Sequence, residues 1–199
     1  MNEKGINKET RDRIITSACN YILSQEIDPR DNGCFFPSQS NENIEEKRSY
    51  PSRMGWCYGD LGISTALWQA GKQLQNLYWQ NKAIQVFSYS SQRRHFSNCG
   101  ILDCGLCHGT TSISMMYHYL YIQTENELFK DTRDFWLNCT LKMGSENIGL
   151  AGYCAWNGEK ESYVNEYGFL EGVSGIGLML LTVLFEADIS KWMNFFMLN

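Results

Sequence analysis

The sequence has few prolines and no cluster of basic residues. Its three prolines all lie before position 52, so most of the chain is free of the residue that breaks helices. It holds 17 basic and 22 acidic residues, for a net charge of −5, and no run of Lys or Arg is longer than Arg93–Arg94. A protein that binds the phosphate backbone usually carries a basic patch. We therefore expect no nucleic-acid partner.

A long apolar run is also missing. Residues 1–15 are polar and charged, whereas a secretory signal needs an apolar stretch of roughly 7–15 residues. The longest apolar run, residues 176–185, is shorter than the ~18 residues of a membrane span and is typical of a buried helix. These absences predict a cytoplasmic protein with no transmembrane segment.

Cysteine, by contrast, is abundant. With 43% hydrophobic and 20% charged residues the chain has the composition of a globular protein, and it holds eight cysteines. Cytosolic thiols stay reduced, so metal ligation or simple burial is favoured over a disulfide framework. The cysteines are Cys19, Cys34, Cys57, Cys99, Cys104, Cys107, Cys139 and Cys154.

Apolar periodicity predicts an all-α fold in a single domain over residues 1–199. An amphipathic helix is expected at 7–25, and turn formers then indicate a long loop to about residue 51. Strand-like alternation is scarce, and the segment around Val164 is too rich in glycine and polar residues to predict a strand. The further helices are expected at about 62–70, 77–91, 111–123, 126–142 and 174–186.

Three glycine-rich segments align as an internal repeat. CYGDLGIS at 57–64, CHGTTSIS at 107–114 and LEGVSGIG at 170–177 place Gly59, Gly109 and Gly172 in one column. Each offset has room for one helical hairpin, so the pattern predicts stacked helix pairs whose inner helices begin at the glycines, in a toroid or solenoid. Glycine permits a left-handed turn and close approach of the helix starts. The residues just before these glycines should then gather at one end of the array.

In the first two repeats those residues are Cys57 and the pair Cys107–His108. Catalytic zinc usually has three protein ligands and one open position, and Cys and His are common donors. Two thiolates and a neutral imidazole would leave the site formally neutral, so that an incoming thiol could lose its proton and become the fourth ligand. We therefore predict a Zn²⁺ site at Cys57, Cys107 and His108.

Three other interpretations of these residues stay open. The cysteines could be small buried apolar residues. CGLCH at 104–108 matches the C-x-x-C-H pattern of haem attachment, and a structural zinc site could be closed by Cys104 or Cys99.

The other polar residues near the motifs are more simply explained by structural roles. His95 and His118 are more typical of loop and packed histidines, and helix capping is the expected role of Asp60, Asp103 and Glu171.

The motifs together resemble the lanthionine synthetase C-like (LanC-like) cyclase family. The resemblance rests on RMGWCYGDLG at 53–62, DCGLCHG at 103–109, LEGVSGIGL at 170–178 and Trp192 with its apolar tail. It covers residue 30 to the end and corresponds to the carboxy-terminal half of that family. It implies an α/α toroid with zinc at the mouth of a central cavity.

The resemblance also implies a reaction and two further residues. In the family, a zinc-bound cysteine thiolate of a dehydrated precursor peptide adds to dehydroalanine or dehydrobutyrine, and the resulting enolate is protonated. The zinc ligands of the family match Cys57, Cys107 and His108, and its arginine and tyrosine match Arg53 and Tyr58. Arg53 could stabilise the enolate charge and Tyr58 could donate a hydrogen bond, although a packing role is the alternative for both.

Departures from the family pattern qualify this interpretation. Family members are about twice as long, and their amino-terminal half supplies a His-Gly motif and an aspartate that nothing here resembles, so the general acid or base is missing. Leu61 replaces a usual proline and Ser112 a usual glycine. Half a toroid should expose apolar surface, which a complementary half, self-pairing or an interrupted gene would explain.

The alternative function is a non-catalytic zinc module that docks a dehydratase, a transporter or the complementary half. An enzymatic variant would join a small thiol such as glutathione to dehydroamino acids.

Overall fold

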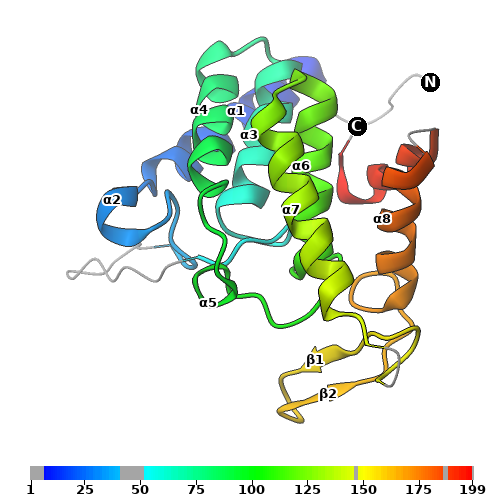
Figure 1. Cartoon of the computed structure of the whole chain (residues 1–199). Helices are drawn as coiled ribbons and strands as arrows, with labels where there is room; N and C mark the ends of the chain where they lie inside the picture. Colours follow the sequence, from blue (N-terminus) through cyan, green and yellow to red (C-terminus); the bar gives the residue numbers. More distant parts are fainter. Residues whose placement is uncertain (1–6, 41–51, 146–147, 186–187, 199) are drawn as a thin grey trace.

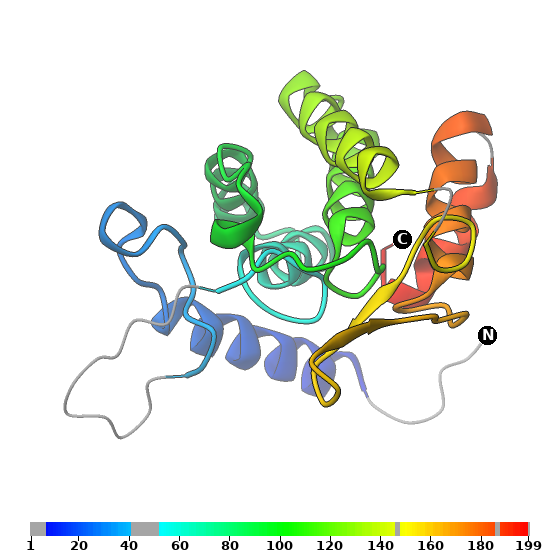
Figure 2. The same ribbon diagram turned by 60° about the horizontal axis from the view of Figure 1, so that its bottom comes forward.

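The computed structural model describes residues 7–40, 52–145, 148–185 and 188–198. Two helical hairpins form its centre: α3 (Asp60–Gln73) with α4 (Leu77–Ser90), and α6 (Thr110–Thr124) with α7 (Glu127–Met143). α8 (Val173–Phe185) and the 3-10 helix η1 (Asp188–Phe196) follow. Figure 1 shows the two hairpins and α8 standing side by side, and Figure 2 shows that they follow an arc, with α1 (Lys8–Ser24) lying across it next to α3.

The predicted helices are confirmed, and their ends agree with the predicted ranges to within three residues. Short connections make the hairpins. Gln75 and Glu125 adopt left-handed backbone conformations, with φ of 54° and 53°, and end the first helix of each pair. Asn76 and Asn126 then cap the second helix, because their side chains accept hydrogen bonds from the amides of its first turn.

The structure shows one strand pair that was not predicted and one short helix within the predicted long loop. Residues 155–164 contain an antiparallel hairpin of β1 (Ala155–Asn157) and β2 (Ser162–Val164), in which Trp156 pairs with Tyr163. Strands this short cannot show alternation in sequence, and the pair is stabilised by an aromatic contact with ring centroids 5.2 Å apart. The expected long loop contains the short helix α2 (Pro29–Asn32) and is otherwise non-helical where it is described; its last part, 41–51, lies outside the described residues. A second short helix, α5 (Phe96–Cys99), precedes α6.

The core lies between the hairpins. Every residue of α6 from Thr110 to Leu120 is buried, so this helix is covered on all sides. Tyr117 on α6 stacks edge-on against Phe87 of α4, and its hydroxyl donates to the Phe87 carbonyl at 2.8 Å. Thr110 and Thr140 share a hydrogen bond of 2.6 Å between α6 and α7. These contacts join α6 to both α4 and α7.

Large apolar side chains are exposed at one end of the arc. α8, η1 and the residue after η1 leave five of them in solvent, whereas α6 is buried from Thr110 to Leu120 and exposes Ile122 in its last turn. The expectation of an exposed apolar edge is thus met at α8 and η1 and not along the buried part of α6. The five are Leu181, Leu184, Phe185, Phe195 and Met197. Among the described residues, no helix combines the length and the apolar character needed to cross a membrane.

Candidate metal centre

Three potential metal ligands converge where α3 and α6 begin. The Sγ atoms of Cys57 and Cys107 and one ring nitrogen of His108 all lie within 4.8 Å of one another. Cys57 precedes α3 by three residues and is exposed, while Cys107 and His108 precede α6 and are half-buried. The two repeat segments therefore bring together the three residues that the sequence predicted.

Main-chain hydrogen bonds join the three glycine turns. The Trp56 amide donates to the Cys107 carbonyl at 3.0 Å, and the Cys107 amide donates to the Leu170 carbonyl at 2.9 Å. Cys107 and Leu170 occupy the same column of the sequence repeat, and Trp56 directly precedes its first member. The repeated segments are therefore neighbours in space, and the third turn is hydrogen-bonded to the second through the Leu170 carbonyl.

Glycine is required at the turns because the backbone approaches itself there. A Cβ on Gly59, which has φ of 89°, would overlap the Arg53 carbonyl oxygen. A Cβ on Gly109 would overlap three backbone atoms of residues 103–105. Such overlaps cannot be relieved by moving a side chain, so any other residue would displace the ligand next to it.

Ser112, which replaces a glycine of the family pattern, also links the two ligand-bearing turns. Its hydroxyl donates to the Cys107 carbonyl at 3.0 Å and accepts from the Trp56 amide at 3.1 Å. The substitution therefore adds a bridge between the segment that carries Cys57 and the segment that carries Cys107. Leu61, which replaces the usual proline, is completely buried.

Two buried carboxylates hold the loops that carry the ligands. Asp103 accepts from the amides of Gly105 and Trp156, both at 2.9 Å, and so ties the second turn to the β-hairpin. Asp60 accepts from the amides of Phe35 and Phe36 at 3.0 Å and pairs with Arg93 at 3.5 Å. Burial raises the pKa of Asp60 despite these partners.

The capping roles expected for these two aspartates were therefore wrong. Asp60 accepts amides from a distant segment, Asp103 accepts one local amide and one distant amide, and the residues that cap α3 and α6 are the glycines Gly59 and Gly109. Local sequence shows an acidic residue beside a glycine turn in both cases, and only the tertiary fold reveals the partners. Glu171 is exposed.

The ligand thiols influence each other's protonation. A hydrogen bond from Cys107 and the nearby His108 lower the pKa of Cys57 to about 5, whereas the bond to Cys57 and burial raise the pKa of Cys107. The contact between the two thiols thus favours ionisation of Cys57 and disfavours ionisation of Cys107. A metal that binds both as thiolates must displace the Cys107 proton, as is general for thiolate sites.

Arg53 and Tyr58 lie beside the ligands. The Arg53 guanidinium donates to the Gly100 carbonyl at 2.8 Å and stands 5.7 Å from the centroid of the exposed Tyr58 ring. Its positive charge acts to lower the pKa of Cys107, although other influences on that thiol are larger. Both residues are thus close to the candidate centre, and their roles in a reaction stay predictions.

The alternative interpretations lose support from the geometry. Cys104 is buried with its thiol toward the Met143 sulfur at 3.7 Å, and the Cys99 thiol donates to the Arg93 carbonyl. Within the part of the chain that the structure describes, neither joins the group of ligands, so they do not close a four-ligand site. The same burial leaves Cys104 unavailable for haem attachment.

The two remaining histidines lie outside the group. His118 is buried on α6 with its Nδ1 3.3 Å from Arg133, and burial together with the Arg133 charge lowers its pKa to about 4. His95 is exposed at the start of α5. The predicted packing and loop roles fit these positions.

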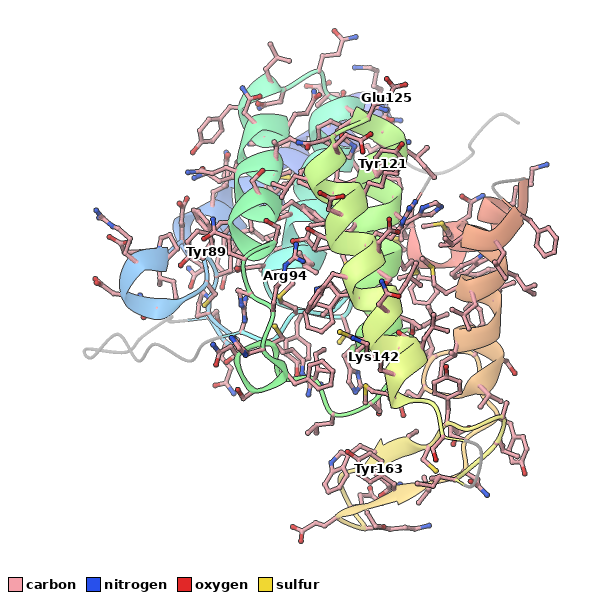
Figure 3. All side chains as sticks on the ribbon, in the orientation of Figure 1. Tyr89, Arg94, Tyr121, Glu125, Lys142 and Tyr163 are labelled. Carbon is pink, nitrogen blue, oxygen red and sulfur yellow. The ribbon has the colours of Figure 1, made fainter. Side chains whose placement is uncertain are left out.

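Two cavities flank the ligands, and the sequence alone indicated neither. One, of about 260 Å³, borders Cys57 and Tyr58 and has mainly apolar walls. The other, of about 550 Å³, lies on the Arg53 side; among its lining residues are Tyr89 and Arg94, which are labelled in Figure 3. The apolar cavity therefore borders the candidate centre directly, whereas the polar cavity includes Arg53 and none of the three ligands.

The fold and the site define an α-helical protein built of stacked hairpins, with a group of ligands suited to zinc at the helix starts. The sequence matches the family of lanthionine synthetase C-like proteins over residues 2–197, and the chain belongs to that family. The family resemblance inferred from the motifs is confirmed, and it extends nearly to the amino terminus of the sequence rather than beginning at residue 30.

Two further similarities agree. The chain is 27% identical over 142 residues to the nisin biosynthesis protein NisC of Lactococcus lactis subsp. lactis, an alignment that covers 70% of this chain and 29% of that protein. Its fold is similar to that of the solved nisin cyclase, with a TM-score of 0.73 and 20% identity, over 98% of this chain and 45% of the other. The predicted α/α toroid fold is confirmed, and the chain spans less than half the length of each relative.

Proposed function

We propose that Cys57, Cys107 and His108 hold a zinc ion and that the chain is the zinc-bearing part of a lanthionine cyclase. The observation that carries this proposal is the convergence of the three ligand atoms within 4.8 Å. Cys sulfur and His nitrogen are preferred zinc donors, and three protein ligands with an open position are typical of catalytic zinc. The exposure of Cys57 favours an open position that a substrate can reach.

The proposed reaction adds a peptide cysteine to a dehydroalanine or dehydrobutyrine of the same precursor peptide. A sulfur–Cβ bond forms, the π electrons of the double bond move to the neighbouring carbonyl oxygen, and Cα then takes a proton, so that the thiol proton is conserved overall. Bound zinc would supply the acidity that keeps the substrate thiol deprotonated at neutral pH.

Arg53 is proposed to stabilise the negative charge on that carbonyl oxygen. One of its amino groups is fixed by the Gly100 carbonyl, which orients the guanidinium beside the ligands. A guanidinium offers five N–H donors, so others stay available for an oxyanion. Tyr58 is proposed to hold the Arg53 side chain in place through the contact with its ring.

We propose that proton transfer at Cα needs a complementary part of the toroid. No segment of these 199 residues resembles the His-Gly motif or the aspartate of the family's amino-terminal half, which would supply the acid or base. The solved nisin cyclase is more than twice as long as the region that this chain matches. The partners proposed are therefore a dehydrated precursor peptide and the complementary half.

A second candidate is a zinc module without catalytic activity that docks a dehydratase, a transporter or the complementary half. The exposed apolar side chains of α8 and η1 favour a docking role, because soluble proteins seldom leave such a group uncovered.

Zinc analysis and complementation separate the two candidates. The purified chain should carry about one zinc per chain, and Cys57→Ala, Cys107→Ala and His108→Ala should lose it. With the complementary half of a LanC-like cyclase and a dehydrated peptide, ring formation should remove the free thiol, which is measured as loss of alkylation by iodoacetamide. If the purified chain carries zinc but the peptide thiol is still fully alkylated, the enzyme proposal is overturned and the zinc module is supported. If the purified chain carries no zinc, both proposals are overturned.

A further inference from the structure

The smaller of the two cavities opens directly beside the candidate centre. It encloses about 260 Å³, and Cys57 forms part of its wall. The wall is otherwise mainly apolar, and its apolar members come from α1, the segment before residue 41 and the start of α3. They are Tyr21, Ile22, Phe36, Pro37, Tyr58 and Ile63.

This cavity is built on a fixed framework. Phe36 is fully buried, and its amide is held by the Asp60 carboxylate at 3.0 Å. Asp60 is itself the first residue of α3, three positions after Cys57. The buried carboxylate therefore fixes the apolar wall to the helix start that positions the ligand, so that the cavity and Cys57 keep a constant relation.

Tyr58 lines this cavity and contacts Arg53, a residue that lines the polar one. Its side chain helps to line the apolar cavity, while the Arg53 guanidinium, which belongs to the polar cavity, stands over its ring. The polar cavity contains Arg93, Arg94 and His95 as well. A peptide whose thiol reaches Cys57 thus finds apolar side chains in one direction and cationic ones in the other.

We infer that the cavity bounded by Ile22, Phe36 and Ile63 receives an apolar side chain from the residue next to the substrate cysteine. The inference rests on the proposed function, because it takes a peptide thiol as the group that approaches the centre. Pockets for drug-sized ligands enclose ~300–1,000 Å³, so this smaller space suits one aliphatic or aromatic side chain. Neighbouring Cα atoms lie ~3.8 Å apart, so a side chain adjacent to the cysteine can reach a cavity whose wall includes Cys57.

The consequence is a preference among peptides that differ at one position. Placing a leucine or phenylalanine side chain in the cavity removes apolar surface from water, whereas a serine gains nothing there. Partial burial of such a side chain is expected to tighten binding about tenfold. The polar cavity offers no equivalent gain to an apolar residue.

Thiol binding to the cobalt-loaded chain tests this preference without requiring ring formation. Co²⁺ replaces zinc as the probe, and thiolate-to-cobalt absorption reports each thiol that reaches the metal. Short blocked peptides with one cysteine, preceded or followed by leucine, phenylalanine or serine, are titrated into the loaded chain. The apolar neighbour should lower the dissociation constant about tenfold on at least one side of the cysteine.

Two variants locate the effect in the cavity. Ile22→Gln makes the wall polar, and Ser38→Trp fills the space from a half-buried position that carries less risk to folding. Both should reduce the preference to within about twofold. Ile14→Gln is the matched control, because Ile14 lies on the same helix, is exposed and does not line the cavity. Circular dichroism checks that each variant is folded.

The outcomes distinguish this inference from the function on which it rests. A preference that disappears in Ile22→Gln and Ser38→Trp and persists in Ile14→Gln supports the cavity as the specificity site. Equal affinity for all peptides, or a preference that survives both cavity variants, overturns the cavity alone. Cobalt binding with no spectral response to any peptide overturns the proposed function and the cavity together.

Discussion

The second and third glycine turns have almost the same hydrogen bonds but carry different side chains. In the second turn, the Thr110 amide donates to the Asp103 carbonyl and the Gly105 amide donates to the Asp103 carboxylate. In the third turn, 63 residues later, the Val173 and Gly168 amides donate to the corresponding groups of Glu166. Thr111 and Ser174 repeat the match, since their hydroxyls donate to the carbonyls of Cys104 and Tyr167.

Only the residues before the glycine distinguish the two turns in their capacity to bind metal. Cys107 and His108 stand in the second turn where Leu170 and Glu171 stand in the third. The backbone turn is therefore a scaffold that can be repeated without a metal, and the metal site needs particular side chains on it. The second turn is also largely buried and faces Cys57, whereas the third is mostly exposed and supports the second through the Leu170 carbonyl.

Ligand substitutions should show the largest difference between the turns. Zinc sites in small domains bind with roughly 10–16 kcal/mol, so loss of one of three protein ligands should cost about 4 kcal/mol, or about 1,000-fold in affinity. We expect this loss in Cys107→Ala and His108→Ala, measured by competition with a zinc chelator. Glu171→Ala, at the equivalent position of the third turn, is the control and should keep its zinc affinity. Equal effects at Glu171 and His108 would contradict the ligand assignment.

Glycine substitution should damage the scaffold itself. Gly109→Ala places a Cβ against three backbone atoms and should lower the free energy of unfolding by at least 3 kcal/mol. Gly177→Ala, within α8 and with no neighbouring atom in reach, should instead raise it by up to about 1 kcal/mol. Urea denaturation of the metal-free chains measures both. A stable Gly109→Ala variant would contradict the close approach of the backbone at this turn.

Asp103 and Glu166 occupy equivalent positions in the second and third turns but should contribute different amounts to the free energy of unfolding. Asp103 is buried and accepts two amides, one of them from the β-hairpin, so Asp103→Ala should lower the free energy of unfolding by about 2–3 kcal/mol. Glu166 is half-buried, and its side chain accepts the Gly168 amide, so Glu166→Ala should cost no more than about 1 kcal/mol. The same denaturation experiment compares them. Equal losses of unfolding free energy in the two variants would contradict this difference between the turns.

The smallest effect concerns a histidine that lies outside the turns. Burial and Arg133 lower the pKa of His118 from 6.5 to about 4, so between these values the unfolded chain binds more protons than the folded one. Stability should therefore fall as the pH is lowered through this window, by roughly 2 kcal/mol from pH 7 to pH 5. His118→Gln should flatten this dependence in denaturation curves and leave zinc affinity unchanged. A change in zinc affinity would place His118 in the metal site.

Much of the fold and all three candidate ligands could be predicted from the sequence. Helical periodicity indicated the main helices, and the repeat aligned Cys57 with Cys107 because both turns need glycine two residues later. The repeat in fact begins earlier, since Gly55, Gly105 and Gly168 also align. That earlier column would have indicated the matching turns around Asp103 and Glu166.

Other features depend on contacts between distant segments. Asp60 accepts the Phe35 amide, 25 residues away, and Asp103 accepts the Trp156 amide, 53 residues away; neither of these two contacts leaves a local pattern. The β-hairpin has strands of three residues, too short for alternation to appear, and the bridging hydroxyl of Ser112 joins two repeats. The apolar cavity arises only when α1 and the segment before residue 41 pack beside α3.

Zinc K-edge X-ray absorption of the zinc-loaded chain, with and without a cysteine peptide, tests the central claim most directly. An open three-ligand site at Cys57, Cys107 and His108 predicts two sulfur ligands, one nitrogen and one oxygen from water in the free chain. Added thiol should replace the oxygen and give three sulfurs and one nitrogen. A free chain that already has four protein ligands, or a ligand shell that does not change with thiol, would contradict the account.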